Sequence, residues 1–189
     1  MSGFEFFFGF FGLILGLSVV EVITGFGKVL RRRDRLRLGW VTPLLALFVL
    51  LDVASFWSIS WVRMQGVEPS YLLLLIGLAI AGVYYLAASL VFPDDLDAWP
   101  SLDEFYDGHK RWVIGGVWIA KTLSHTALLG VVGGVDALRA FWTSPATLIV
   151  VLWVFPPMLA ICLVRNRIAN AVMLAWLIMF YVVRLAFLS

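Results

Sequence analysis

The chain has 189 residues, of which 62% are hydrophobic and 14% are charged, and its formal net charge is +2. A soluble domain is about 45–50% apolar and about 25% charged, so this composition excludes an ordinary soluble protein and indicates an integral membrane protein. The chain has no nucleic-acid-binding motif, so we expect no nucleic acid partner. Its single cysteine, Cys162, excludes an intrachain disulfide and a metal cluster built on cysteines.

Six apolar segments are long enough to cross a membrane, which takes about 20 residues in a helix. The first begins in MSGFEFFFGFFGLILGLSVV, which has no basic n-region or signal cleavage site, so we expect it to be a retained span. The runs are continuous, whereas strands of a membrane barrel alternate in polarity over about ten residues. The predicted fold is therefore a single all-α domain, residues 1–189, with six transmembrane helices. The spans are Phe6–Val29, Gly39–Val62, Tyr71–Phe92, Trp112–Val135, Ala146–Val164 and Ala169–Leu188.

Basic residues are concentrated in the first, third and fifth loops. The first loop, KVLRRRDRLRLGW, holds six of them. The third and fifth loops add Lys110, Arg111, Arg165 and Arg167. The opposite side has only Arg63, Arg139 and, near the end of the last span, Arg184. Because cytoplasmic loops are enriched in Lys and Arg, we predict that both termini lie outside, in a bacterial inner membrane.

The third loop, PDDLDAWPSLDEFYDGHKR, is the longest. Ser101, with Glu104 three residues later, is a capping-box pattern, and the next apolar residues share one side. We therefore predict a short amphipathic interfacial helix that ends in a bend at Gly108. The acidic residues of the loop fit no metal-binding spacing, so we expect a solvated loop without metal or cofactor. These residues are Asp94, Asp95, Asp97, Asp103, Glu104 and Asp107.

Two short stretches, LRLGWVTP (Leu36–Pro43) and LRAFWTSP (Leu138–Pro145), share the pattern L-R-x-x-W-x-x-P. Each precedes a span, and three spans separate them. Equivalent elements would therefore enter the membrane from opposite sides, as in the inverted repeats of many transporters. A 3+3 inverted repeat and a chance match both remain open at this point.

Four ionisable residues lie at membrane depth on three spans. At about 1.5 Å per residue, Glu21 lies about 10 Å from the cytoplasmic end of its span, Lys121 about 14 Å, and Asp52 and His125 about 20 Å. A charge at the bilayer centre costs roughly 2.5–3.5 kcal/mol on insertion scales, which favours pairing between helices. By depth, we expect Glu21 to pair with Lys121 and Asp52 with His125.

Further residues lie near this polar layer. Ser55 is one turn from Asp52, and Tyr84 lies at a similar depth in the third span. Pro156 and its neighbour Pro157 deprive carbonyls one turn earlier of their donors, which neighbours, water or an ion then satisfy. We predict an ion or solute pathway through this layer. The alternative is that these residues only hold helices together, and Arg184 is expected to extend outward, with Glu5 as its partner.

The first span also carries a smooth stripe of small residues at Gly9, Gly12 and Gly16. Small residues allow membrane helices to approach closely, so this stripe predicts a packing interface. Its partner is a helix of the same chain, a second copy or another membrane subunit. We expect a homo-oligomer or a subunit of a larger complex in the lipid bilayer.

The sequence lacks the motifs of zinc proteases, serine hydrolases, P-loop proteins and dinucleotide-binding enzymes, so we favour a protein without catalytic activity. The leading hypothesis is a small transporter or channel-like protein that moves or couples an ion, proton or small solute, with protonation at Glu21, Asp52 or His125. The first alternative is a non-catalytic scaffold or accessory subunit, and the second is a membrane enzyme that acts on lipid. Transport requires water access to Lys121, a scaffold requires a dry and fully paired layer, and an enzyme requires a pocket beside the acidic loop.

Overall fold

The computed structural model describes residues 3–32, 39–65, 67, 68 and 70–188, and every regular element in this part of the chain is helical. The prediction of an all-α fold is confirmed. The tip of the first loop, with Arg33, Arg35, Arg37 and the motif residue Leu36, lies outside the described residues. The elements are α1 (Gly3–Arg31), α2 (Val41–Met64), α3 (Tyr71–Ser89), α4 (Leu102–Leu123), the π-helical turn η1 (Ser124–Leu128), α5 (Leu129–Thr143), α6 (Pro145–Leu163) and α7 (Arg167–Leu188).

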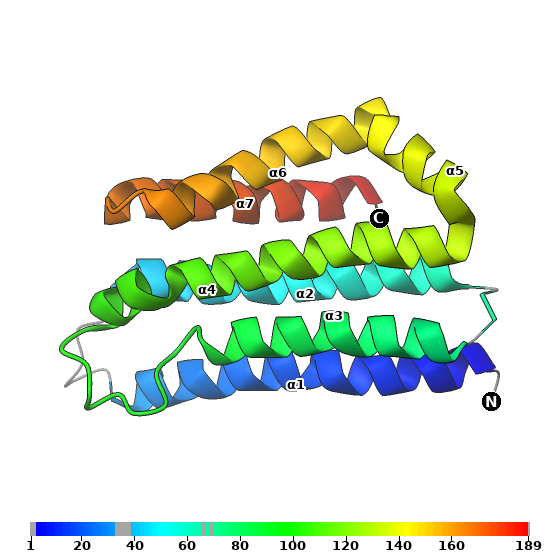
Figure 1. Cartoon of the computed structure of the whole chain (residues 1–189). Helices are drawn as coiled ribbons and strands as arrows, with labels where there is room; N and C mark the ends of the chain where they lie inside the picture. The colour runs from blue at the N-terminus through cyan, green and yellow to red at the C-terminus, as the bar shows by residue number, and fades with distance from the viewer. Residues whose placement is uncertain (1–2, 33–38, 66, 69, 189) are drawn as a thin grey trace.

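The long helices form three layers of two (Figure 1). α1 lies beside α3, α2 beside α4 in the middle layer, and α6 beside α7 in the third layer. The middle layer packs on both neighbours, through α1–α2 and α3–α4 contacts on one side and α2–α7 and α4–α6 contacts on the other. The two chain ends lie towards one end of the bundle, and the connection from α3 to α4 and the turn from α6 to α7 lie at the other. Side chains of α2 and α4 therefore form the centre of the molecule.

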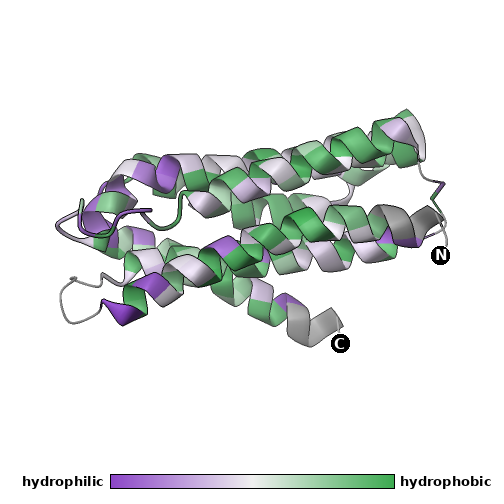
Figure 2. Ribbon diagram, turned by 90° about the horizontal axis from the view of Figure 1, so that it is seen from below, coloured by the Kyte–Doolittle hydropathy of each residue, from purple (hydrophilic) through white to green (hydrophobic). Residues whose placement is uncertain are grey.

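Five of the helices, α1, α2, α3, α6 and α7, are long and apolar enough to cross a membrane. Many of their large apolar side chains face outward; Leu13, Leu152 and Ile168, for example, are 68%, 68% and 77% exposed. Figure 2 shows apolar residues along the length of the helices, with most hydrophilic residues at the end that holds the α3–α4 connection. Long helices with an apolar outer surface match the hydrocarbon core of a bilayer, so the chain is an integral membrane protein.

The prediction of a separate interfacial helix before the fourth span is wrong. Its residues are the first turns of α4, which runs through Gly108 without a break. One of the two bonds of the expected capping box is present, because the Ser101 hydroxyl accepts a hydrogen bond from the Glu104 N–H at 3.3 Å. A single glycine costs a helix only about 1 kcal/mol, and the buried face of α4 continues past Gly108, so the helix has no reason to stop there.

At its other end α4 passes into the π-helical turn η1. Three side chains bond back to carbonyls of the preceding turn: Ser124 and His125 to the Lys121 carbonyl at 2.8 and 2.7 Å, and Thr126 to the Thr122 carbonyl at 2.6 Å. Such bonds compete with the backbone ladder, and a π-helical turn accommodates one extra residue. The sequence of η1 therefore explains why the regular helix is interrupted here.

α5 connects the middle layer to the third layer and changes direction on the way (Figure 1). Gly134 within it has φ 70° and ψ −173°, a conformation that only glycine adopts readily. The chain is thereby directed from α4 towards α6 at the end of the bundle opposite the α3–α4 connection. This change of direction leaves room between α4, α6 and α7 for the pocket described below.

Candidate functional site

The centre of the bundle is built around the carboxylate of Asp52, which is fully buried on α2. The Tyr84 hydroxyl of α3 donates to its Oδ2 at 2.7 Å, and the Tyr181 hydroxyl of α7 donates to its Oδ1. The ammonium group of Lys121 on α4 lies 2.7 Å from the same Oδ1. Hydrogen bonds to a charged acceptor are stronger than neutral ones, so four helices are joined at one carboxylate.

Lys121 therefore pairs with Asp52, and its expected pairing with Glu21 is wrong. α1, which carries Glu21, packs on α2 and α3 and makes no extensive contact with α4. Among the described residues Glu21 has no ion-pair partner, and its side chain is half-buried. Depth along a span says nothing about the direction in which a side chain points, and the long lysine stem reaches across a helical turn to a carboxylate at another depth.

The expected contact between His125 and Asp52 is also wrong. His125 lies in η1, where its Nδ1 donates to the Lys121 carbonyl at 2.7 Å. Its ring lies beside the Phe141 ring, with the centroids 5.1 Å apart. Lys121 and His125 therefore line the same pocket, but the His125 ring lies against Phe141 and not against Asp52.

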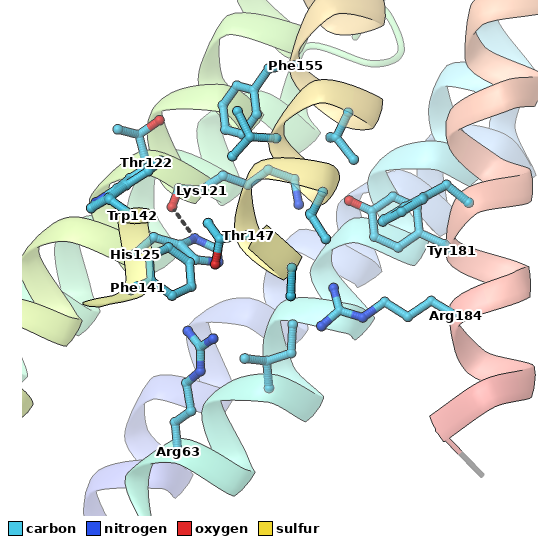
Figure 3. A pocket seen from close by; sticks show the side chains of 16 residues that line it. Arg63, Lys121, Thr122, His125, Phe141, Trp142, Thr147, Phe155, Tyr181 and Arg184 are labelled. Carbon is cyan, nitrogen blue, oxygen red and sulfur yellow. Dashed lines mark hydrogen bonds between the residues drawn. The ribbon is translucent and has the colours of Figure 1, made fainter. Parts of the chain in front are cut away.

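A partly open pocket of about 220 Å³ extends from Lys121 between α2, α4, α5, α6 and α7. Figure 3 shows its lining, with the Lys121 ammonium and the Tyr181 hydroxyl pointing into the same space. The polar part of the lining includes Arg63, Lys121, Thr122, His125, Thr147, Tyr181 and Arg184. The apolar part includes Ile59, Phe141, Val151, Val154, Phe155 and Phe180. The pocket therefore extends from Lys121 of the buried ion pair to Arg63 and Arg184, near the ends of α2 and α7.

The charge of this pocket is unbalanced. Two arginines, Arg63 near the end of α2 and Arg184 near the end of α7, line it, and none of the aspartates and glutamates in the described part of the chain does. Neither arginine forms an ion pair with any described residue. The Arg63 guanidinium lies 5.4 Å from the centroid of the Phe141 ring, which a cation favours. Arg184 was expected to extend outward towards Glu5; instead its side chain turns into the pocket (Figure 3).

A second, much smaller cavity of about 20 Å³ lies beside the ion pair. Ser55 and Tyr84, two of the predicted pathway residues, line it together with Lys121 and His125. A cavity of roughly 10–15 Å³ is large enough for one water molecule, so this space can hold a water next to Lys121. Ser55 is thus brought close to the charged centre without bonding to Asp52.

Pro156 is not brought to either cavity. It lies within α6 with an exposed side chain, two residues from Val154 of the pocket lining. Of the carbonyls expected to lose their donors, that of Trp153 is satisfied by a neighbouring helix, because it accepts a hydrogen bond from the indole N–H of Trp176 at 3.3 Å. The two rings also stack, with their centroids 4.9 Å apart. Contacts between Trp153 and Trp176 therefore join α6 to α7 one turn before the proline pair.

The glycine stripe of α1 is divided between two environments. A Cβ at Gly12 would overlap the ring of Trp57 on α2, so this glycine allows a close helix contact within the chain. Gly9 and Gly16 have no atom of another residue near the position of a Cβ, and both are exposed. The stripe therefore packs against α2 at Gly12, whereas Gly9 and Gly16 face away from the bundle.

At the opposite end of the bundle the acidic loop is paired with basic loops. Arg32 lies 2.5 Å from Asp97, and Arg167 lies 2.7 Å from Asp107 and 3.7 Å from Asp103. Lys110, which is almost fully buried, donates to the Val164 carbonyl at 2.6 Å, and burial lowers the pKa of its ammonium group. Three of the acidic residues, Asp97, Asp103 and Asp107, thus have basic partners here, in contrast to the arginines of the pocket.

Sequence reasoning missed Tyr181 and the pocket roles of Arg63 and Arg184. Tyr181 is twelve residues from the cytoplasmic end of the predicted last span, about 18 Å deep, so depth alone would have placed it beside Asp52. Arg63 and Arg184 were recognisable as basic residues on the side with few basic residues. No pattern in the sequence indicated that both would point into one cavity.

The arrangement holds a fixed Asp–Lys pair, a partly open pocket with unpaired cations and an aromatic lining, but no cluster of metal-binding residues within the described ranges. No protein-family model, curated protein or solved structure matches this chain.

Proposed function

We propose that this protein is a small membrane transporter that admits a solute from the outer side to the pocket and couples its movement to the Asp52–Lys121 pair. The observation that carries this proposal is the pocket of about 220 Å³ whose lining includes Lys121. Lys121 is 17% exposed, whereas its partner Asp52 is 0% exposed. One member of the ion pair is thus within reach of a solute, and the other is shielded from it.

The two alternatives receive less support. A scaffold calls for a dry layer in which every charge is paired, but Arg63 and Arg184 face the pocket without an acidic partner among the described residues. An enzyme acting on lipid calls for a pocket beside the acidic loop. A cavity between α4 and α6 does lie there, lined by Arg111 and Cys162, but none of the described residues that line it is an aspartate or glutamate. Buried polar groups of membrane helices are functional by default, which favours transport over a structural role.

The proposed membrane arrangement has six spans. α4 carries charged residues at its start and so is not among the five apolar helices, but α4 and η1 together run the length of the bundle beside α2 (Figure 1). A sixth span that ends near Gly134 fits the basic loops on the cytoplasmic side and both termini outside, in a bacterial inner membrane. A homo-oligomer or a larger complex belongs to the same proposal. A 3+3 repeat would make α1, α2 and α3 equivalent to α4, α6 and α7, so the contact of α1 with α3 would correspond to one of α4 with α7. In the structure α4 packs along α6 rather than α7, so the inverted repeat gains no support.

The Asp52–Lys121 pair supplies the proposed coupling. If Asp52 takes up a proton, its ion pair with Lys121 is lost, while the hydroxyls of Tyr84 and Tyr181 still hold the neutral acid. The Lys121 ammonium is then free to turn into the pocket, towards His125 and the two arginines. Loss of the proton restores the pair and withdraws Lys121. Protonation and solute binding are thereby linked through one side chain.

Cysteine accessibility tests the proposal directly. In a Cys162→Ser background, Thr147→Cys places a thiol in the pocket lining, and Leu148→Cys places one on the neighbouring residue, which is 46% exposed on the apolar outer surface. We expect a charged, membrane-impermeant thiol reagent added from outside to modify the cysteine at 147 at least tenfold faster than that at 148, because the reagent reacts with thiolate in contact with water. Equal and slow modification of both would mean a dry layer, and a scaffold would then be the better description.

A further inference from the structure

The unpaired cations of the pocket indicate the chemistry of its ligand. Arg63 and Arg184 come from α2 and α7, and both guanidinium groups point into the same space (Figure 3). With Lys121 paired to Asp52, the two arginines leave the pocket with an excess of positive charge. Both arginines lie near the ends of their helices, and the described residues offer no acidic side chain that would balance their charge in the pocket.

The remaining lining restricts the ligand further. Phe141, Phe155 and Phe180 give the pocket aromatic walls, and Thr147 and Thr122 contribute hydroxyl groups. An engineered cavity of about 150 Å³ holds benzene, so about 220 Å³ holds a molecule of roughly nine heavy atoms. A guanidinium group pairs with a carboxylate through two parallel hydrogen bonds, which makes arginine well suited to carboxylates and phosphates.

We propose that the pocket binds a small organic anion with an apolar body, its carboxylate held by Arg63 and Arg184 and its body against the phenylalanine rings. This inference rests on the proposed function and names the class of solute. A lipid phosphate would offer the same negative charge, but the small aromatic enclosure reaching in to Lys121 fits a free solute of benzoate size better than a phospholipid head group. Release of Lys121 by protonation of Asp52 adds a third cation for the same anion.

Three molecules of nearly equal size and shape show whether binding depends on the charge of the ligand or only on its shape. Benzoate is the anion, benzamide the neutral analogue and benzamidinium the cation. For the purified protein in an uncharged detergent, titration calorimetry should detect benzoate binding, with benzamide at least tenfold weaker and benzamidinium undetectable. Equal affinity for benzoate and benzamide would overturn the proposal, because the arginines would then contribute nothing to recognition.

Variants assign the binding to the two arginines. Arg184→Gln and Arg63→Gln should each weaken benzoate binding about 10- to 100-fold, the range expected for losing a charge-assisted hydrogen bond. Arg139→Gln is the matched control, because Arg139 is exposed on α5 outside the pocket lining, and its affinity for benzoate should stay within twofold of the original. Unchanged binding in both pocket variants would contradict the proposal.

A pocket-filling variant keeps the test decisive where an arginine variant fails to fold. Thr147→Trp fills the pocket from α6 and should abolish benzoate binding, and retained binding would exclude this pocket.

Nanodiscs of phosphatidylcholine and of phosphatidylglycerol show whether the arginines bind a free solute or a lipid. If benzoate does not bind and phosphatidylglycerol alone stabilises the protein through Arg184, the arginines hold lipid phosphate and the proposal is wrong. The two proposals can fail separately. Absent benzoate binding would contradict the proposed ligand, whereas slow modification of the cysteine at 147 would show a dry pocket and contradict the proposed transport.

Discussion

The two outer layers of the bundle meet the middle layer through different chemistry. On the α1–α3 side the contact is made mainly of apolar side chains, such as the buried Leu15, Val22 and Ile80. On the α6–α7 side, Tyr181 of α7 bonds to Asp52, which forms the ion pair of the middle layer with Lys121, and the pocket lies beside them. Many small contacts hold the first side together, whereas a few strong and mutually dependent ones hold the second. Substitutions on the two sides should therefore differ in size and in additivity.

The largest effect is expected from breaking the central ion pair. Lys121→Met leaves the Asp52 charge buried with only tyrosine partners, and removing one member of a buried pair costs about 3–5 kcal/mol. Replacing both members, Asp52→Leu with Lys121→Met, should recover much of that loss, since no unpaired charge remains. The free energy of unfolding in mild detergent, measured across the double-mutant cycle, gives the coupling between the two residues.

Glu21 provides the control for this cycle. It lies at a depth similar to that of Lys121 but on α1, which makes no extensive contact with α4. Glu21→Leu combined with Lys121→Met should therefore show additive losses. Rescue of Lys121→Met by Glu21→Leu, and not by Asp52→Leu, would mean that the ion pair at the centre is assigned to the wrong acid.

An intermediate effect is expected at the tyrosines that hold Asp52. Tyr181→Phe and Tyr84→Phe each remove one hydrogen bond to a buried carboxylate, at a cost of about 1.5–3 kcal/mol. Tyr85, the neighbour of Tyr84, is 38% exposed and does not bond to Asp52, so Tyr85→Phe should change stability by less than about 0.5 kcal/mol. Chemical unfolding of the three variants under one condition measures the difference. Equal losses at Tyr84 and Tyr85 would show that the hydroxyl bond contributes nothing specific.

The helical fold was predictable from the sequence because the length of each apolar run follows from the thickness of the bilayer. Depth also placed Glu21, Asp52, Lys121 and His125 in one layer, and two of these four do meet. The pairing was not predictable, because it depends on which helices are neighbours and on the direction of each side chain. For His125 the decisive feature was η1, a local change caused by side chains bonding back to the helix.

The smallest expected change in stability concerns the apolar side, and it should differ between two glycines of the stripe on α1. Gly12→Leu introduces a side chain where the Trp57 ring already lies, and such overpacking costs about 1–3 kcal/mol. Gly16→Leu meets open space within the chain, so the stability of the isolated chain should change by less than about 0.5 kcal/mol. The free energy of unfolding in detergent measures both. A large loss for Gly16→Leu would mean that a second copy or another subunit covers this face, and cross-linking of the variant in membranes would then show a changed oligomeric state. Equal and negligible losses at both positions would show that the contact between Gly12 and Trp57 is too loose to fix α1 against α2.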